Sequence, residues 1–469
     1  MTITKKLFQI ILIGSLLAVT ACHKESIIND DANDLQFNDE DIFGISKEKD
    51  TLSEIDAVTV AKIYRRNQLT TKANTSKTIK NIVTIPDENG QPAIYAINFD
   101  DGYIWVSASK KLCPILAIVD HGTFSLDNSK IGIDIVKQDY LGLMNQCEIT
   151  DSIKRFWRKY EAPTGTQEIS TRISDDYIEE LNELKEYAQE NKYRMYRLSD
   201  AADNEVPEWI VNSFTDIASD AYAGRGFDGS EYDYPETAYI LEGDIDETLI
   251  LGPFTYTNWD QESPYNSLVP NKKLLGCVTV ATAQYMRYYK KPTVYKTKEG
   301  NICDWTNMPN TSSNNTLSMF LADLRSRLGI NDNGYGSVFD IVPLLKSEFE
   351  YKWVNIFDYD IEKLRYPLSE NKIVILRGRI PNGDGHVWIC DGIRYLSYCG
   401  TEYRLYVLNY QEYPDFEYIN IKNEIDNASY STPYCHMNWG WGGDHDGWFF
   451  GSNWNSGNGN FSTERKMIY

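Results

Sequence analysis

The sequence predicts an α+β protein with more than one domain. The chain has 469 residues, which at roughly 150 residues per domain suggests two or three domains. Apolar residues recur at helical spacing in some segments, whereas others form short β-prone runs between glycine-rich turns. Hydrophobic residues make up 42% of the chain and charged residues 24%, which is ordinary for a globular protein.

The N-terminus has the features of an export signal. Lys5 and Lys6 precede an apolar run, residues 7–19, which is too short to span a bilayer comfortably. The run ends in L-A-V-T-A-C, and small residues just before Cys22 resemble the bacterial lipobox, in which the cysteine is acylated. The alternative is an ordinary signal peptide followed by an unrelated cysteine. We expect residues 1–21 to be a lipoprotein signal peptide. Cys22 would then anchor an exported chain to the bacterial cell envelope, at the outer membrane or the cell surface. The alternative location is outside the cell, after processing releases the chain.

Three segments with different patterns follow. Residues 22–55 are acidic and polar and are predicted to be a tether. Residues 56–150 read as a small α+β domain, in which one amphipathic helix precedes a hairpin whose strands flank Asp100-Asp101-Gly102. Residues 151–250 are predicted to be an acidic, mostly helical connector, and residues 251–469 mix one strong helix with β-prone runs.

Charge and cysteine content exclude some functions. The formal net charge of −22 opposes binding to phosphate backbones, so nucleic acid is not an expected partner. Of the eight cysteines, seven remain if Cys22 carries lipid, and an odd number in an exported protein indicates a free thiol. No C-x-x-C pair is present, so neither a structural zinc site nor a thioredoxin-type redox pair is expected. We predict no metal site.

The segment 276–289, G-C-V-T-V-A-T-A-Q-Y-M-R-Y-Y, predicts a buried helix that begins at Cys277. The unpaired N–H groups at a helix N-terminus favour an anion, so we expect the thiol pKa of Cys277 to fall. A cysteine before an apolar helix is also commonly a small core residue. Catalysis by this thiol therefore requires a basic partner.

His386 is the best candidate for that partner among the five histidines. It stands at the start of the apolar run H-V-W-I-C, behind a glycine-rich loop, so it is expected at a cleft edge on a rigid strand. Asn438 is followed by Trp439, and an amide can accept the imidazole N–H while the indole shields that bond. The alternative is a hydrogen-bonded structural histidine.

Gln261 lies sixteen residues before Cys277, in W-D-Q-E-S-P-Y-N. Its side-chain amide could join the Cys277 backbone N–H in an oxyanion hole. The order Gln, Cys, His, Asn along the chain is that of papain-like enzymes.

These segments resemble the streptopain family of papain-like bacterial cysteine proteases. The matching motifs also include C-D-W-T-N-M-P (303–309), G-H-V-W-I-C-D-G and N-W-G-W-G-G-D-H-D-G-W-F, and they span most of 251–450. Upstream, A-I-Y-A-I-N-F-D-D-G-Y-I-W-V-S-A-S and P-I-L-A-I-V-D-H-G-T-F resemble the family's inhibitory propeptide. The family usually has alanine where Thr279 stands, and the connector 151–250 is outside the resemblance.

The resemblance implies a papain-like domain at 251–469, with a helix-bearing half and an antiparallel-sheet half, preceded by an inhibitory propeptide at 56–150. It implies a cysteine endopeptidase zymogen without cofactor. Cys277 would be the nucleophile, His386 the base and Gln261 the oxyanion donor, with Asn438 and Trp439 supporting His386. Expected partners are protein or peptide substrates, the chain's own propeptide and, through Cys22, a membrane. The alternatives are a catalytically idle lipoprotein that binds or inhibits proteases, and a papain-like acyl transferase.

Overall fold

The computed structural model describes residues 44–68, 78–127, 130–163, 175–223, 238–380, 383–407, 423–426, 430–451 and 464–469. The chain divides into residues 1–36 and a second unit, 37–469, to which all of the described residues belong. The predicted signal peptide, Cys22 and most of the tether lie outside the described residues. Within the described ranges, no helix has both the length and the apolar character needed to cross a bilayer.

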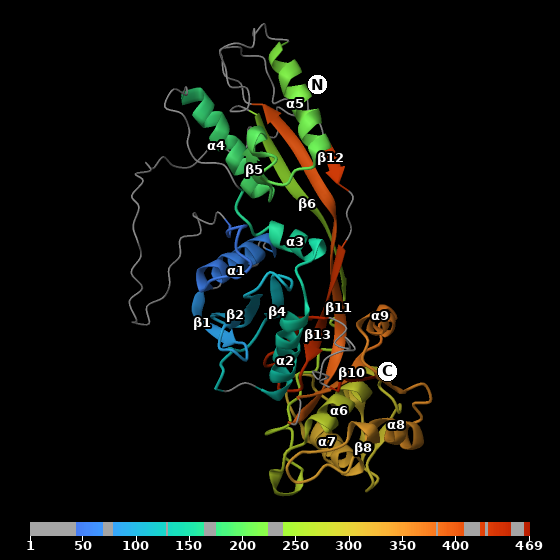
Figure 1. Cartoon of the computed structure of the whole chain (residues 1–469). Coiled ribbons are helices and arrows are strands. Elements are labelled where there is room, and N and C mark those ends of the chain that lie inside the picture. The colour runs from blue at the N-terminus through green and yellow to red at the C-terminus, as the bar shows by residue number, and fades with distance from the viewer. Residues whose placement is uncertain are drawn as a thin grey trace. The chain divides into compact units, whose positions relative to one another are not determined.

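The N-terminal domain is a four-stranded antiparallel meander covered by helices (Figure 1). The predicted hairpin is confirmed, with its turn at Gly102 in a left-handed conformation (φ 80°). A Cβ at this position would lie 2.2 Å from the carbonyl oxygen of Val119, so the turn requires glycine. The elements are α1 (Glu54–Gln68), β1 (Ile79–Pro86), β2 (Pro92–Phe99), β3 (Tyr103–Ser107), β4 (Ile115–Val119), α2 (Ile131–Gln146) and α3 (Asp151–Arg158).

This domain extends beyond the predicted boundaries of 56 and 150. Ile45 and Leu52, within the expected tether, are buried, and their backbone N–H groups donate to the carbonyls of Tyr160 and Ala108. Trp157 of α3 packs in the same core and donates its indole N–H to the carbonyl of Leu112 at 2.7 Å. A few apolar side chains thus bring both flanking segments into the domain despite their acidic surroundings.

The C-terminal domain has a helical half and a sheet half, which confirms the predicted α+β class. The first three helices share a core with one face of two central strands, β10 and β11, whereas the fourth packs in the core on the other face of these strands. The helices are α6 (Cys277–Tyr289), α7 (Asn315–Arg327), α8 (Ile341–Phe349) and α9 (Ile361–Ser369). The strands are β7 (Tyr295–Lys296), β8 (Ile302–Cys303), β9 (Ile356–Asp358), β10 (Val374–Arg379), β11 (Gly385–Val407), β13 (Tyr430–Asn438), β14 (Gly447–Phe450) and β15 (Lys466–Ile468). Short 3₁₀ turns span Leu198–Asp200, Pro270–Lys272, Trp305–Asn307 and Val338–Asp340.

The two domains share one β-sheet. Strand β4 of the N-terminal domain pairs antiparallel with β14, in the register Ala117 to Phe449 and Val119 to Gly447. The strand order is β1-β2-β3-β4-β14-β13-β11-β10-β15-β9. One hydrophobic core joins α2 to residues of β10, β11 and β13. The N-terminal domain is therefore docked through backbone hydrogen bonds as well as side chains.

The connector is helical over most of its described residues, as predicted, and it also adds a long strand to the sheet, which was not predicted. Strand β6 (Ala238–Leu251) pairs with β11 along its whole length, and β5 (Arg194–Arg197) pairs with β6. Helices α4 (Asp175–Glu190) and α5 (Glu208–Ala223) pack on this ribbon, beside which β12 (Asn423–Asp426) pairs with β11 (Figure 1). Glu242 of β6 is buried and ion-paired with Arg158 of α3 at 2.8 Å, which ties the connector to the N-terminal domain.

Candidate active site

Cys277 is the first residue of α6, as predicted. Gly276 precedes it at φ 81°, and a Cβ there would lie 2.3 Å from the carbonyl oxygen of Gly334. Only glycine fits this close approach, which fixes the entry of the chain into the helix. The side chain of Cys277 is partly buried against the helical core.

His386 is the second residue of β11, and its side chain is buried, with 2% of the residue exposed. Its Nε2 is 2.9 Å from the carbonyl oxygen of Trp439. The imidazole lies against three indoles, with ring-centroid distances of 4.8 Å to Trp441, 6.0 Å to Trp388 and 6.1 Å to Trp439. The strand and the indoles together hold the ring in one orientation.

The structure brings Cys277 next to the strand that carries His386. The backbone of Val387, the neighbour of His386, lies within hydrogen-bonding reach of the Cys277 thiol and favours its ionised form. Burial has the larger effect and raises the pKa of the thiol, so the expected fall in the Cys277 pKa is wrong for this state of the protein. Burial also lowers the pKa of His386, to about 4. Both shifts favour the neutral thiol and the neutral imidazole over the ion pair, whereas attack requires the thiolate.

Gln261 lies beside the start of α6. Its carbonyl accepts a hydrogen bond from the backbone N–H of Leu275 at 2.9 Å, two residues before Cys277. The carbonyl of Trp259, in the same segment, accepts from Gly442 N–H at 3.2 Å. This segment thus lies between the nucleophile helix and the tryptophan-rich loop that covers His386, a position suited to an oxyanion-hole residue.

Asn438 does not orient His386 directly, contrary to the prediction. Its Nδ2 donates to the carbonyl of Thr257 at 2.7 Å, and its Oδ1 accepts from Gln284 Nε2 at 3.0 Å. The main-chain carbonyl of Trp439 takes the predicted role. Sequence reasoning missed this carbonyl because every residue carries one, and it overlooked Gln284 within the small-residue run of the helix.

Helix α2 of the N-terminal domain packs on the indoles around His386. A Cβ at Gly132 would lie 2.6 Å from the Trp439 ring and 3.0 Å from the Trp441 ring. The Lys130 ammonium, just before α2, lies 5.3 Å from the centre of the Trp441 ring. The Tyr103 hydroxyl is 3.1 Å from His445 Nδ1 in the adjoining loop. The N-terminal domain thus contacts the surroundings of the candidate base.

The remaining cysteine and histidine side chains near this site have other partners. His436 Nδ1 lies 2.6 Å from Asp391 Oδ1, and Cys435 is a free, buried thiol. Across the described ranges, no cluster of three potential metal ligands occurs. Seven cysteines, 113, 147, 277, 303, 390, 399 and 435, are unpaired.

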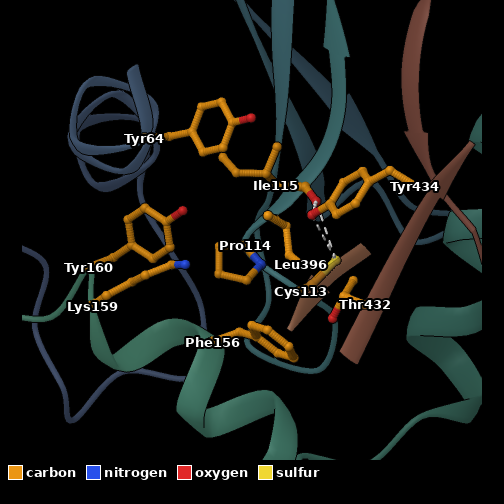
Figure 2. A pocket seen from close by; sticks show the side chains of 10 residues that line it. All are labelled: Tyr64, Cys113, Pro114, Ile115, Phe156, Lys159, Tyr160, Leu396, Thr432 and Tyr434. Carbon is orange, nitrogen blue, oxygen red and sulfur yellow. Dashed lines mark hydrogen bonds between the residues drawn. The ribbon is translucent and has the colours of Figure 1, made fainter. Parts of the chain in front are cut away.

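A small pocket lies at the interface of the N-terminal domain with strands β11 and β13 (Figure 2). Figure 2 shows the Tyr434 hydroxyl turned toward Cys113 and Ile115, and it donates to the Ile115 carbonyl at 2.9 Å. None of the five predicted catalytic residues lines this pocket. It is part of the domain interface and not of the candidate active site.

Comparisons with known proteins concern the same part of the chain. Residues 259–449 match the Peptidase C10 family, and this range contains all five predicted catalytic residues. The chain is 24% identical over 257 residues to the thiol protease/hemagglutinin PrtT of Porphyromonas gingivalis. That match covers 45% of this chain and only 25% of the longer relative.

Two solved structures from Prevotella intermedia are also similar. A fragment of prointerpain A covers 84% of this chain and 98% of its own, at 14% identity and a TM-score of 0.44. Active interpain A covers 47% of this chain and 94% of its own, at 21% identity and a TM-score of 0.32. The finding on the family is therefore a match of residues 259–449, less than half of the chain, to the Peptidase C10 family.

Proposed function

We propose that this protein is a cysteine endopeptidase made as a latent, exported and lipid-anchored precursor. The observation that carries the peptidase assignment is the juxtaposition of Cys277, at the N-terminus of α6, with the strand that presents His386. The match to Peptidase C10 covers both residues.

The chemistry follows from these positions. The Cys277 thiolate attacks a peptide carbonyl, and the resulting oxyanion is stabilised by its own backbone N–H and by Gln261. His386, oriented by the Trp439 carbonyl, takes the thiol proton as the thiolate forms, gives this proton to the leaving amine and then activates water to hydrolyse the thioester. These residues suffice for hydrolysis without an added cofactor.

Latency is supported by the way the N-terminal domain docks. Strand β4 pairs with β14, and α2 presses on the indoles that hold His386. In this docked state, burial raises the pKa of Cys277 and lowers that of His386, to about 4, and both shifts disfavour the thiolate–imidazolium pair. Because docking is intramolecular, even modest affinity between the domains gives a high occupancy of the blocked state.

The test of the peptidase assignment and of latency uses a fluorogenic peptide and the full chain. Uncut chain should turn over slowly, and a cut between the N-terminal domain and β6 should raise turnover. A fragment for comparison should begin at about residue 238, because starting at 250 would remove most of the strand that pairs with β11. Adding the domain of residues 44–163 back in trans should suppress the fragment. Equal turnover by the uncut chain and the fragment would refute latency, while no turnover by either would refute the peptidase assignment.

Export and lipidation rest on the N-terminal sequence alone. The apolar run of residues 7–19 and the small residues before Cys22 support a lipoprotein signal. More than one acyl chain on Cys22 would hold the protein stably at a membrane surface, with residues 23–43 as the spacer.

A further inference from the structure

A closed ring of buried side chains lies behind the peptide group that orients His386. Thr257, Gln284 and Asn438 are 5%, 1% and 4% exposed, and they come from the chain before α6, from α6 itself and from β13. Thr257 Oγ1 donates to Gln284 Oε1 at 2.7 Å, and Gln284 Nε2 donates to Asn438 Oδ1 at 3.0 Å. Asn438 Nδ2 donates to the Thr257 carbonyl at 2.7 Å, which closes the ring.

The ring has only one consistent polarity. The Thr257 carbonyl can only accept, so the Asn438 amide must direct Nδ2 toward it and Oδ1 toward Gln284. Gln284 must then present its Nε2 to Asn438, which leaves its Oε1 for the Thr257 hydroxyl. Loss of the hydroxyl removes the partner that selects this orientation of the Gln284 amide.

The ring reaches His386 through one peptide group. Asn438 Oδ1 also accepts the Gly440 N–H at 3.2 Å. That N–H belongs to the same planar peptide as the Trp439 carbonyl, which lies 2.9 Å from His386 Nε2. Fixing the N–H end of the peptide therefore fixes the direction of its C=O end.

We propose that Gln284 and Thr257 are positioning residues for the reaction, which act through Asn438 and the Trp439–Gly440 peptide to orient the His386 imidazole. This inference rests on the proposed function. It assigns Asn438 an indirect role, since the amide orients the peptide and the peptide orients the base. The same ring joins α6, which carries Cys277, to the end of β13, which leads into the Trp439–Gly440 peptide. It therefore fixes the position of the nucleophile helix relative to the peptide that orients His386.

The test compares Thr257→Val with Thr257→Ser in the full-length chain after processing. Valine matches the size of threonine but lacks the hydroxyl, whereas serine keeps the hydroxyl. Covalent labelling with a thiol-directed epoxide counts the folded, reactive sites, so kcat is expressed per competent site. We expect Thr257→Val to lower kcat roughly tenfold, the rate equivalent of one hydrogen bond of ordinary strength, with KM unchanged because the ring does not face substrate.

The pH profile separates positioning from a purely structural role. The hydrogen bond to the Trp439 carbonyl raises the pKa of His386. Loosening that carbonyl should therefore move the alkaline limb of kcat/KM, which reports imidazolium ionisation, to lower pH in Thr257→Val and leave it in place in Thr257→Ser. Gln284→Leu, which removes the central amide at similar volume, should shift the same limb and provides a second variant if Thr257→Val does not fold.

The outcomes are distinguishable. A lower melting temperature with an unchanged kcat per labelled site and an unchanged alkaline limb would overturn the positioning role while leaving the peptidase assignment intact. Absence of turnover by the processed wild-type chain would instead overturn the proposed function.

Discussion

Gly132 gives a sharp test of how latency is maintained. It lies in the first turn of α2, where a Cβ would lie 2.6 Å and 2.7 Å from two carbons of the Trp439 ring. The indole has little freedom to move, because its Nε1 donates to the His445 carbonyl and its backbone N–H donates to Asp446 Oδ1. Gly132→Ala should therefore weaken docking of α2 on the site.

The expected size follows from overpacking. Forcing a methyl group into a well-packed interface typically costs about 1–3 kcal/mol, which corresponds to roughly a 5- to 150-fold larger undocked population. Helix propensity acts in the opposite direction, since alanine in place of glycine favours a helix by about 1 kcal/mol. The two effects predict opposite signs, so the measurement decides between them.

The assay is peptide turnover by the uncut chain, relative to the same preparation after full processing. Gly132→Ala should raise this ratio, and hydrogen exchange of the β4 amides that pair with β14 should accelerate in parallel. Gln138→Ala is the matched control, because it places alanine at an exposed position of the same helix. A ratio in Gly132→Ala equal to or below that of the wild type would refute the contact as a cause of latency.

Further predictions concern the site, the anchor and pH. Cys277→Ala should abolish hydrolysis while preserving the melting temperature within a few degrees, and His386→Ala should do nearly the same; residual activity near wild type in a peptide assay would contradict the dyad. Gln261→Ala should lower kcat about 100-fold, the usual effect of removing one oxyanion donor, as measured in the same assay. Cys22→Ser should move the protein from the membrane to the soluble fraction on fractionation, whereas retention would indicate an uncleaved signal segment. Burial lowers the pKa of His386, to about 4, and also lowers the pKa of His445. If both imidazoles have their ordinary pKa near 6.5 in an undocked state, that state binds protons at higher pH than the docked state does. Docking should therefore weaken as the pH falls from about 6.5 toward 4, and faster hydrogen exchange of the β4 amides would report it.

Much of the fold was predictable because it depends on local patterns. The small residues after Cys277 predicted α6, and Asp100-Asp101-Gly102 predicted the hairpin turn. The pairing of β6 with β11 was not predictable, because it joins residues 238–251 to residues 393–407. Nothing within 238–251 specifies a partner so distant in the chain, and the acidic residues of that strand suggested a solvated connector instead. Burial of Glu242 depends on Arg158, which is 84 residues away in the sequence.

The candidate site shows the same division between local and distant information. Residue types singled out Cys277, His386 and Gln261 as candidates, because thiol, imidazole and amide chemistry belong to side chains. The predicted fall in the Cys277 pKa was wrong, since a helix N-terminus is a local feature whereas burial of Cys277 depends on how the rest of the protein packs around it. A helix dipole typically contributes about 0.3–1 kcal/mol, and desolvation of a fully buried ionisable group exceeds it.

Asn438 was predicted to accept a hydrogen bond from His386, but the main-chain carbonyl of Trp439 occupies that position. An asparagine near a histidine invites a direct hydrogen bond, yet its amide oxygen here serves Gln284 and the Gly440 N–H. The group that faces His386 is a main-chain carbonyl, which no side-chain substitution removes. Replacing Trp439 would delete the indole and leave that carbonyl in the chain. Substitutions at Asn438, Gln284 or Thr257 should therefore impair His386 more selectively through the peptide than replacement of the residue that contains it, provided that the three indoles around the ring keep their packing.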